Sequence, residues 1–218
     1  MEKKNDKKIR AILFDIDDTL FPSGEFASLA RRNAMRAMIA AGMRATEKQA
    51  LAAHMQILEK YGSNYSRHFD LLAKKFPCQN PLRAIAAGIA AYHGTKTSIY
   101  PFPHSRAMLL RLQHAGYLLC VATEGKALKQ WDKLIRLGLD PFFAHVFITA
   151  KKSPSFYRSC ARKLRLPSHE CLMVGDHPRK DFLYAKKAGM LALLVVKGKP
   201  MQKSASKEML GRLSSLLL

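Results

Sequence analysis

Apolar segments of strand length recur along this 218-residue chain, and each ends in polar or small residues. Most are almost continuously apolar, which is typical of strands buried on both faces of a parallel sheet. The segments are residues 9–14, 117–122, 145–149, 170–174 and 191–196. Helical periodicity separates the last four, at residues 105–115, 127–137 and 155–166. Alternating strands and helices predict right-handed βαβ units, and hence an α/β fold with a Rossmann-like, doubly wound parallel sheet.

The alternation stops between residues 21 and 104, where only helical patterns occur. The expected helices are residues 25–43, 46–61, 65–76 and 81–93. Thr46 and Gln49 have the spacing of a capping box at the start of the second helix. We therefore expect an α/β core domain formed by residues 1–20 and 105–218, with an all-helical domain of residues 21–104 inserted in it.

The net charge of the chain is +21, from 37 Lys and Arg residues against 16 Asp and Glu residues. This excess indicates an anionic partner such as a phosphorylated small molecule, nucleic acid or an anionic membrane surface. It is spread over the core and the inserted helices rather than gathered in a tail, and no nucleic-acid-binding motif accompanies it. Nucleic acid is thus a possible partner without support from a motif.

The sequence shows no sign of membrane insertion. Residues 1–8 are charged, and Asp15 interrupts the apolar run that follows, so neither a signal peptide nor a membrane span is expected. The four cysteines lie far apart, and those in apolar segments, Cys120 and Cys171, are expected to be buried reduced thiols. We expect a cytoplasmic protein, whose oligomeric state the sequence leaves open.

Three carboxylates follow the first apolar strand, in the segment Asp15-Ile16-Asp17-Asp18-Thr19. In a strand, Asp15 and Asp17 point to the same side, where two like charges need a cation or strong hydrogen bonds. Open α/β sheets bind ligands at the carboxyl ends of their strands, so the expected cation is Mg²⁺. The alternative from these residues alone is a polar turn in which Asp18 or Thr19 caps a helix.

This segment resembles the first motif of the haloacid dehalogenase-like (HAD) phosphohydrolases, and three further motifs follow in that family's order. They are an apolar strand that ends in Thr123-Glu124-Gly125, a lysine motif in residues 151–157, and Gly175-Asp176 with Asp181 five residues on. The helical insertion stands where the family carries its C1 cap, which closes over the substrate. The segments 30–34, 61–65, 68–70 and 129–133 resemble a mostly archaeal branch of subfamily IA that includes glyceraldehyde 3-phosphate phosphatases.

The resemblance implies a catalytic set. Asp15 would be the nucleophile that forms an aspartyl-phosphate. Asp17 would be the general acid for the leaving alcohol and then the base for the attacking water. Thr123 would hydrogen-bond a phosphoryl oxygen, and Lys151 would pair with Asp15 and bind the phosphoryl group.

The resemblance also implies a metal site and a phosphate site. Mg²⁺ would be held by the carboxylates of Asp15 and Asp176 and by the backbone carbonyl of Asp17. Asp181 would not bind the ion directly but would orient either Mg²⁺-bound water or Lys151. Backbone N–H groups around Asp18, Glu124 and Gly125 would bind phosphate.

Two departures from the family pattern concern the site. Lys152 stands where the family usually has Pro, so the catalytic lysine is either Lys151 or Lys152. Lys151 is preferred because it keeps Pro154 in the family's register. Glu124 replaces the usual Asp or Asn, which matters little if only its backbone N–H is used.

Two further features receive structural interpretations. Trp131 has helical spacing from Leu128, Leu134 and Ile135, which favours a place in the core over a stacking role. The basic clusters 162–165 and 186–187 are interpreted as solvated helix faces.

The leading hypothesis is therefore a Mg²⁺-dependent phosphatase that hydrolyses a small phosphorylated metabolite. The alternatives are a nucleotide 5′-phosphatase and a non-catalytic member of the fold that binds RNA or a protein partner.

Overall fold

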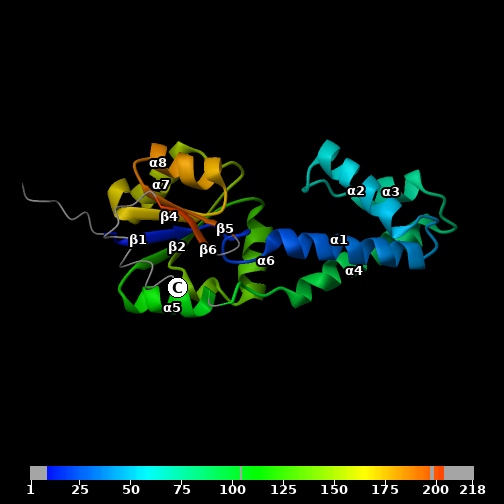
Figure 1. Ribbon diagram of the computed structural model, residues 1–218, viewed down its shortest axis with the longest axis horizontal. Coiled ribbons are helices and arrows are strands. Elements are labelled where there is room, and N and C mark those ends of the chain that lie inside the picture. The colour runs from blue at the N-terminus through cyan, green and yellow to red at the C-terminus, as the bar shows by residue number, and fades with distance from the viewer. Residues whose placement is uncertain (1–8, 104, 197–198, 204–218) are drawn as a thin grey trace, which may run out of the picture. The chain divides into compact units, whose positions relative to one another are not determined.

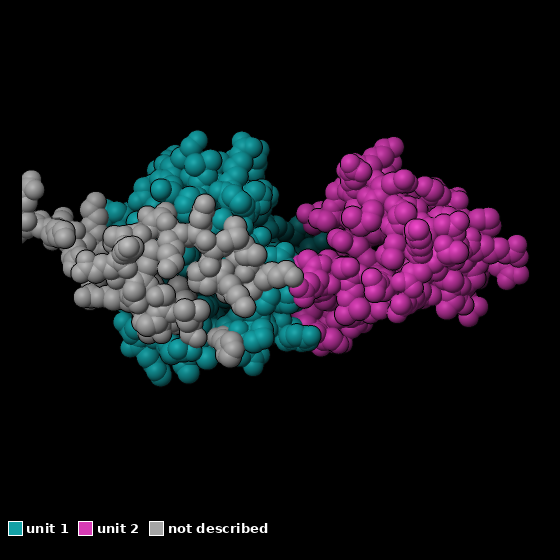
Figure 2. Space-filling model, viewed as in Figure 1, with its two compact units in different colours: residues 1–23, 100–218 teal, residues 24–99 magenta. Residues whose placement is uncertain are grey.

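A computed structural model describes residues 9–103, 105–196 and 199–203. The charged N-terminal segment and the chain after Lys203 lie outside the described residues. The chain divides into two compact units, coloured separately in Figure 2. Unit 1 consists of residues 1–23 and 100–218, and unit 2 of residues 24–99.

Unit 1 is built on a sheet with the strand order β3-β2-β1-β4-β5-β6 within the described residues. Strands β1 to β5 are parallel, and β6 runs antiparallel to β5. The strands are β1 Ala11–Phe14, β2 Leu118–Glu124, β3 His145–Thr149, β4 Cys171–Gly175, β5 Leu191–Val196 and β6 Lys199–Lys203. The predicted doubly wound α/β fold is thus confirmed, although β6 was not among the expected strands.

Strand β1 lies at the centre of the sheet and pairs with both β2 and β4. Its residue Leu13 lies opposite Cys120 on one side and Met173 on the other. All four residues of β1 are buried, as the continuous apolar pattern predicts for a strand covered on both faces. This register brings the carboxyl ends of β1, β2 and β4 to one edge of the sheet.

Helices cover the two faces of the sheet (Figure 1). Helices α7 (Pro154–Leu164) and α8 (Tyr184–Lys187) pack on one face in a core that includes Leu13, Tyr157 and Ala185. The opposite face carries α5 (Ser105–His114) and α6 (Ala127–Leu137). Single turns of 3₁₀ helix are η2 Asp140–Phe142 and η3 Ser168–Glu170, and the π-helical turn η4 is Pro178–Leu183.

Cys120 and Cys171 are buried free thiols, as predicted.

Unit 2 is helical. Its elements are α1 Ser23–Ala40, which begins at the last residue of the first segment of unit 1, α2 Glu47–Tyr61, α3 His68–Lys75, α4 Pro81–Thr95 and the 3₁₀ turn η1 Lys96–Ser98. Its core gathers small and flexible apolar side chains, among them Ala34, Met38 and Leu72. The predicted capping box is present: the backbone N–H of Gln49 donates to the Thr46 hydroxyl, and Gln49 Oε1 accepts from the Thr46 N–H.

The core position predicted for Trp131 is wrong. Leu134 is buried, but the side chains of Leu128, Trp131 and Ile135 are 86%, 42% and 61% exposed. The reason is the orientation of α6: its buried face is formed by Gln130, Leu134 and Leu137, which are spaced by four and three residues, and Leu128, Trp131 and Ile135 lie on its other sides. In the part of the chain that the structure describes, none of the helices has both the length and the apolarity needed to cross a membrane.

Candidate active site

The site forms where β1 and its two neighbours end. Asp15 directly follows β1, and its backbone N–H continues the ladder by donating to the Val174 carbonyl at 2.9 Å. Thr123 lies near the end of β2, and Asp176 follows β4. Because the chain leaves β1 and β4 beside each other at this edge, the side chains meet at the place where open α/β sheets bind ligands.

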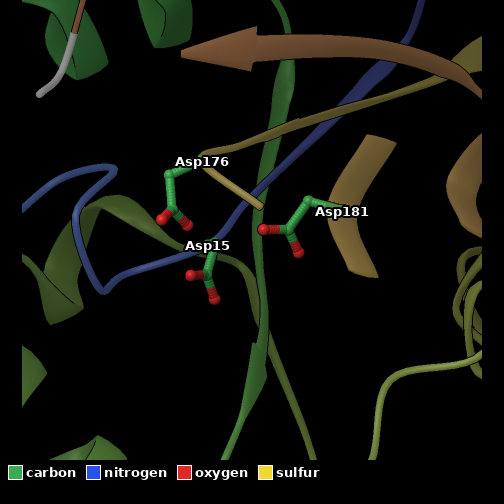
Figure 3. Close-up of side chains that lie close together, drawn as sticks. All are labelled: Asp15, Asp176 and Asp181. Carbon is green, nitrogen blue, oxygen red and sulfur yellow. The ribbon is translucent and has the colours of Figure 1, made fainter. Parts of the chain in front are cut away.

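Three carboxylates converge there: Asp15, Asp176 and Asp181 (Figure 3). One oxygen from each lies within 4.8 Å of the others. Burial raises the pKa of Asp15 to about 7, with the Asp181 and Asp17 charges adding to it and Lys152 opposing it. Burial and the nearby Asp181 and Asp18 also raise the pKa of Asp176. A cation bound among these three carboxylates would reduce the repulsion between their negative charges.

Lys152 bridges two of these carboxylates. Its Nζ atom lies 2.7 Å from Asp15 Oδ1 and 2.5 Å from Asp181 Oδ1, and the side chain is only 3% exposed. Burial lowers the pKa of Lys152, but the two carboxylates outweigh it, so the pKa lies above its usual range. Lys152 is therefore a buried ammonium ion held against the carboxylate expected to act as nucleophile.

The prediction that Lys151 pairs with Asp15 is wrong, because Lys152 makes that contact. Lys151 is exposed, and its backbone N–H donates to Thr149 Oγ1. The backbone N–H of Lys152 instead donates to Glu124 Oε2 at 2.8 Å, which holds the second lysine against the end of β2. Ser153 then caps the N-terminus of α7. In the short segment between β3 and this helix, the side chain of Lys152 is buried and that of Lys151 is exposed.

Asp181 is held by contacts on both of its oxygens. Oδ1 accepts from Lys152 Nζ and from the Tyr157 hydroxyl at 3.2 Å, and Oδ2 accepts from the His177 backbone N–H at 3.1 Å. Gly175 permits this approach, since a Cβ atom there would lie 2.5 Å from the Asp181 side chain. With both oxygens occupied, Asp181 is placed to orient Lys152.

Glu124 contributes its side chain, which the sequence prediction did not use. Its two oxygens accept from Lys180 Nζ at 2.7 Å and from the Lys152 backbone N–H. Burial raises the pKa of Glu124, but these donors outweigh it and hold the pKa below its usual value. The Gln130 side chain also donates to the Glu124 carbonyl at 2.7 Å. Glu124 thus ties β2, the Lys152 segment and η4 together.

Asp17 is paired with a lysine that sequence reasoning missed. Lys133 Nζ, from α6, lies 2.6 and 2.7 Å from the two carboxylate oxygens of Asp17. The partners are 116 positions apart, so no local spacing indicates the pair. The only signal available was that Lys133 belongs to residues 129–133, one of the segments that resemble the archaeal branch.

The predicted phosphate donors are only partly available. Thr123 is buried, and its Oγ1 has no hydrogen-bond partner among the described residues. The backbone N–H groups of Asp18 and Gly125, in contrast, donate to the carbonyls of Phe21 and Thr149, each at 2.8 Å. The structure therefore uses these two N–H groups to shape the loops, and the Thr123 hydroxyl is one of the buried polar groups that lack a partner among the described residues, together with Thr19 Oγ1 and Gln130 Oε1.

The donor set fits a hard divalent cation. Carboxylate oxygens are the ligands that Mg²⁺ prefers. Burial, and then neighbouring carboxylates, raise the pKa values of Asp15 and Asp176, and a bound cation would favour their charged forms. Asp181 has both oxygens engaged by chain donors, which leaves Asp15 and Asp176 as the better side-chain ligands.

Comparison with solved structures shows the same fold. A haloacid dehalogenase-like family hydrolase from Xanthomonas campestris superposes with a TM-score of 0.70 at 17% identity, covering 100% of this chain and 97% of that one. A putative beta-phosphoglucomutase from Thermotoga maritima gives a TM-score of 0.66 at 18% identity, covering 93% and 91%.

Comparison of sequences shows closer relatives. The glyceraldehyde 3-phosphate phosphatase of Methanopyrus kandleri is 40% identical over 199 residues, 88% of this chain and 85% of that protein. The enzyme of the same name from Methanocaldococcus jannaschii is 39% identical over 197 residues, covering 88% and 86%. The family model for haloacid dehalogenase-like hydrolases matches residues 9–189. The chain belongs to the haloacid dehalogenase-like hydrolase family.

Proposed function

We propose that this chain is a Mg²⁺-dependent phosphatase that cleaves a small phosphate monoester through an aspartyl-phosphate on Asp15. The observation that carries the proposal is the Asp15 carboxylate itself. It is buried at the end of β1, with the Lys152 ammonium 2.7 Å from one oxygen and Asp176 beside it. An anionic nucleophile needs such positive charge when it approaches an anionic phosphoryl group.

In the first step, an Asp15 oxygen attacks phosphorus and the bond from phosphorus to the ester oxygen breaks. Asp17 gives its proton to the departing alkoxide, so that an alcohol leaves. Lys152 neutralises part of the charge on the transferring group, and the Thr123 hydroxyl, which has no partner among the described residues, donates to a phosphoryl oxygen.

In the second step, water attacks the phosphorus of the aspartyl-phosphate and the bond to the Asp15 oxygen breaks, releasing inorganic phosphate. Asp17 takes the proton of this water and is ready to act as acid again. Both oxygens of Asp17 accept from Lys133 in the structure, so this ion pair opens when Asp17 transfers a proton.

The residues that would hold Mg²⁺ are Asp15 and Asp176 through their carboxylates and Asp17 through its backbone carbonyl. Bound there, the ion supplies positive charge that offsets the repulsion between nucleophile and phosphate. Asp181 and Tyr157 keep Lys152 in place behind these ligands.

The substrate we propose is glyceraldehyde 3-phosphate or a closely similar small phosphate ester. This rests on the relatives from Methanopyrus kandleri and Methanocaldococcus jannaschii, which are named for that activity and match along most of this chain. We also propose unit 2 as the cap domain, because it stands in the chain between β1 and β2, where the family inserts one.

The test is turnover of a panel of phosphate esters by the full chain, with and without Mg²⁺. The panel contains glyceraldehyde 3-phosphate, phosphoserine, phosphoglycolate and 5′-nucleotides. We expect the highest kcat/KM with glyceraldehyde 3-phosphate, no turnover in EDTA, and none in Asp15→Asn. Preference for nucleotides would overturn the substrate assignment, and turnover by Asp15→Asn would overturn the nucleophile. Absence of turnover with every ester would favour a binding role for this fold.

A further inference from the structure

Two basic clusters that are separate in the sequence form one face of unit 1. Helices α7 and α8 pack side by side on the same face of the sheet (Figure 1). The Arg158 guanidinium of α7 reaches the Lys187 carbonyl of α8 at 3.5 Å, which places the two helix surfaces in contact. The exposed cations of this basic face are Arg158, Arg162, Lys163, Arg165, Arg179, Lys186 and Lys187.

Within the part of the chain that the structure describes, no carboxylate pairs with the cations of the basic face. Among the described residues, none of the seven forms an ion pair, whereas Lys180 in η4 is paired with Glu124. The single carboxylate on α7, η4 and α8 belongs to Asp181, which is buried and held by Lys152. A solvated helix face usually mixes both signs of charge, so a face with cations alone indicates an anionic partner.

The basic face is separate from the catalytic groups. Lys152, which contacts Asp15, is buried and precedes α7, and none of the seven exposed cations has a hydrogen bond to a site side chain among the described residues. The cations of the basic face are therefore not part of the phosphate-ester site.

The arrangement of the cations fits a repeating phosphate chain. Arg158 and Arg162 are four residues apart in α7, which puts them on one side of the helix about 6 Å apart, and Arg165 follows directly after the last residue of the helix. Arginine side chains pair well with phosphate because their planar guanidinium groups donate two parallel hydrogen bonds. Lys186 and Lys187 extend the charge across the neighbouring helix.

Other polyanions fit less well. A membrane-binding face needs exposed apolar side chains to enter the lipid, and among the described large apolar residues only Leu183 is exposed on these elements. A single-strand-binding face needs free aromatic rings for stacking on bases. The rings of Phe182 and Tyr184 are only partly exposed and lie under Lys186 and Arg179, at 5.6 and 5.8 Å from the ring centres.

We propose that the basic face of α7 and α8 binds the phosphate backbone of double-stranded DNA without reading its sequence. Duplex DNA carries one negative charge per about 1.7 Å of helix axis, which is the dense, repeating phosphate charge that a face of cations alone would bind. The proposal does not depend on the phosphatase activity, and either can fail without the other.

The test is fluorescence anisotropy of a labelled DNA duplex titrated with the full chain between about 50 and 200 mM salt. Two variants are compared with the parent. Arg162→Gln with Lys163→Gln removes two charges from the basic face, and Lys48→Gln with Arg83→Gln removes two exposed charges from unit 2 as the matched control. Thermal unfolding midpoints check that both variants fold.

We expect a dissociation constant of roughly 10⁻⁴ to 10⁻⁶ M near physiological salt, with affinity that falls steeply as salt rises. The face variant should lower the steepness of the log–log salt plot by about 1.8, since each lost phosphate contact removes about 0.9. The control variant should keep the parental slope. The proposal is overturned if the duplex does not bind, if both variants behave alike, or if single-stranded DNA, an RNA duplex or anionic phosphatidylserine vesicles bind as tightly as the DNA duplex.

Discussion

The ammonium group of Lys152 lies 2.7 Å from the carboxylate of Asp15, and both side chains are almost fully buried. The same nitrogen also contacts Asp181, so one cation stands between two carboxylates from different parts of the chain. The nucleophile we propose is therefore fixed in direction before any substrate arrives.

Replacement of Lys152 tests the role of this contact. Lys152→Ala leaves Asp15 and Asp181 facing each other without compensation, which costs about 3–5 kcal/mol of stability when a buried ion pair is broken. We expect kcat to fall by about 10²–10³, as for loss of a group that stabilises transition-state charge.

The neighbouring lysine supplies the control. Lys151→Ala removes an exposed ammonium group, so we expect kcat and the free energy of unfolding to stay within about twofold and 0.5 kcal/mol of the parent. Steady-state kinetics and urea unfolding measure both quantities. Equal losses in the two variants would show that the contact in the structure is not the one that matters.

Lys133 holds both oxygens of Asp17 and should affect the proton-transfer steps. Lys133→Met frees the Asp17 side chain to take other rotamers, so the acid is less well placed under the leaving oxygen. We expect kcat/KM to fall about 10²-fold for an alkyl phosphate and much less for p-nitrophenyl phosphate, whose leaving group needs no acid. A parallel loss for both esters would instead indicate general damage to the site.

Arg136→Met on the same helix is the matched variant for that experiment. Arg136 forms an exposed ion pair with Asp132 at 2.8 Å, and exposed pairs contribute little. Its kinetics should equal those of the parent for both esters.

Gly175 marks the closest approach of backbone to the Asp181 side chain. A Cβ atom there would lie 2.5 Å from Asp181 Cβ and Cγ, so Gly175→Ala must push Asp181 away from Lys152. We expect a loss of about 1–3 kcal/mol in stability and a fall in kcat at saturating Mg²⁺.

Gly94→Ala is the comparison, because a Cβ atom at Gly94 meets nothing within 4 Å. Gly94 lies in α4, where alanine is the better helix former, so this variant should unfold at an equal or higher urea concentration. If Gly175→Ala is as stable and as active as the parent, the close packing around Asp181 is not required.

His54 in unit 2 predicts a pH dependence of stability. Burial, and then the charges of His68 and Arg31, lower the pKa of His54 from 6.5 to about 4. The unfolded chain therefore binds an extra proton between these values. Stability that is fully present above pH 6.5 is lost as the pH falls toward 4, by up to about 3 kcal/mol.

The measurement is urea unfolding at a series of pH values between neutral and mildly acidic. His54→Leu should lose less stability on acidification than the parent, whereas His93→Gln, which changes an exposed histidine, should follow the parental curve. Identical pH dependence in parent and His54→Leu would contradict the assignment.

Much of the fold could be predicted because local pattern and parallel topology agree. The apolar runs mark β1 to β5 within two residues at each end, and the acidic segment after β1 indicates where the carboxylates gather. Strand β6 was missed because its sequence, Lys199 to Lys203, has neither apolar alternation nor β-branched residues, and its pairing with β5 defines it.

The side-chain pairs could not be predicted, because they depend on three-dimensional packing. Lys151 and Lys152 are neighbours of the same type, and the groups that hold Lys152 inward, Glu124 at its backbone and Asp15 and Asp181 at its ammonium group, are distant in sequence. Lys133 meets Asp17 across 116 residues. Trp131 lies on the exposed side of α6 because Leu134 and Leu137 form the side that packs into the core.

The most direct test of the proposed mechanism is to trap phosphate on Asp15. In Asp17→Asn, p-nitrophenyl phosphate can still transfer its phosphoryl group, since its leaving group needs no acid, but water lacks the base for the second step. Rapid acid quench followed by peptide mass spectrometry should find a phosphoryl group on Asp15, with a burst of p-nitrophenol close to one per enzyme molecule in Mg²⁺. Steady release of p-nitrophenol without a burst, and with Asp15 unmodified, would contradict the aspartyl-phosphate mechanism.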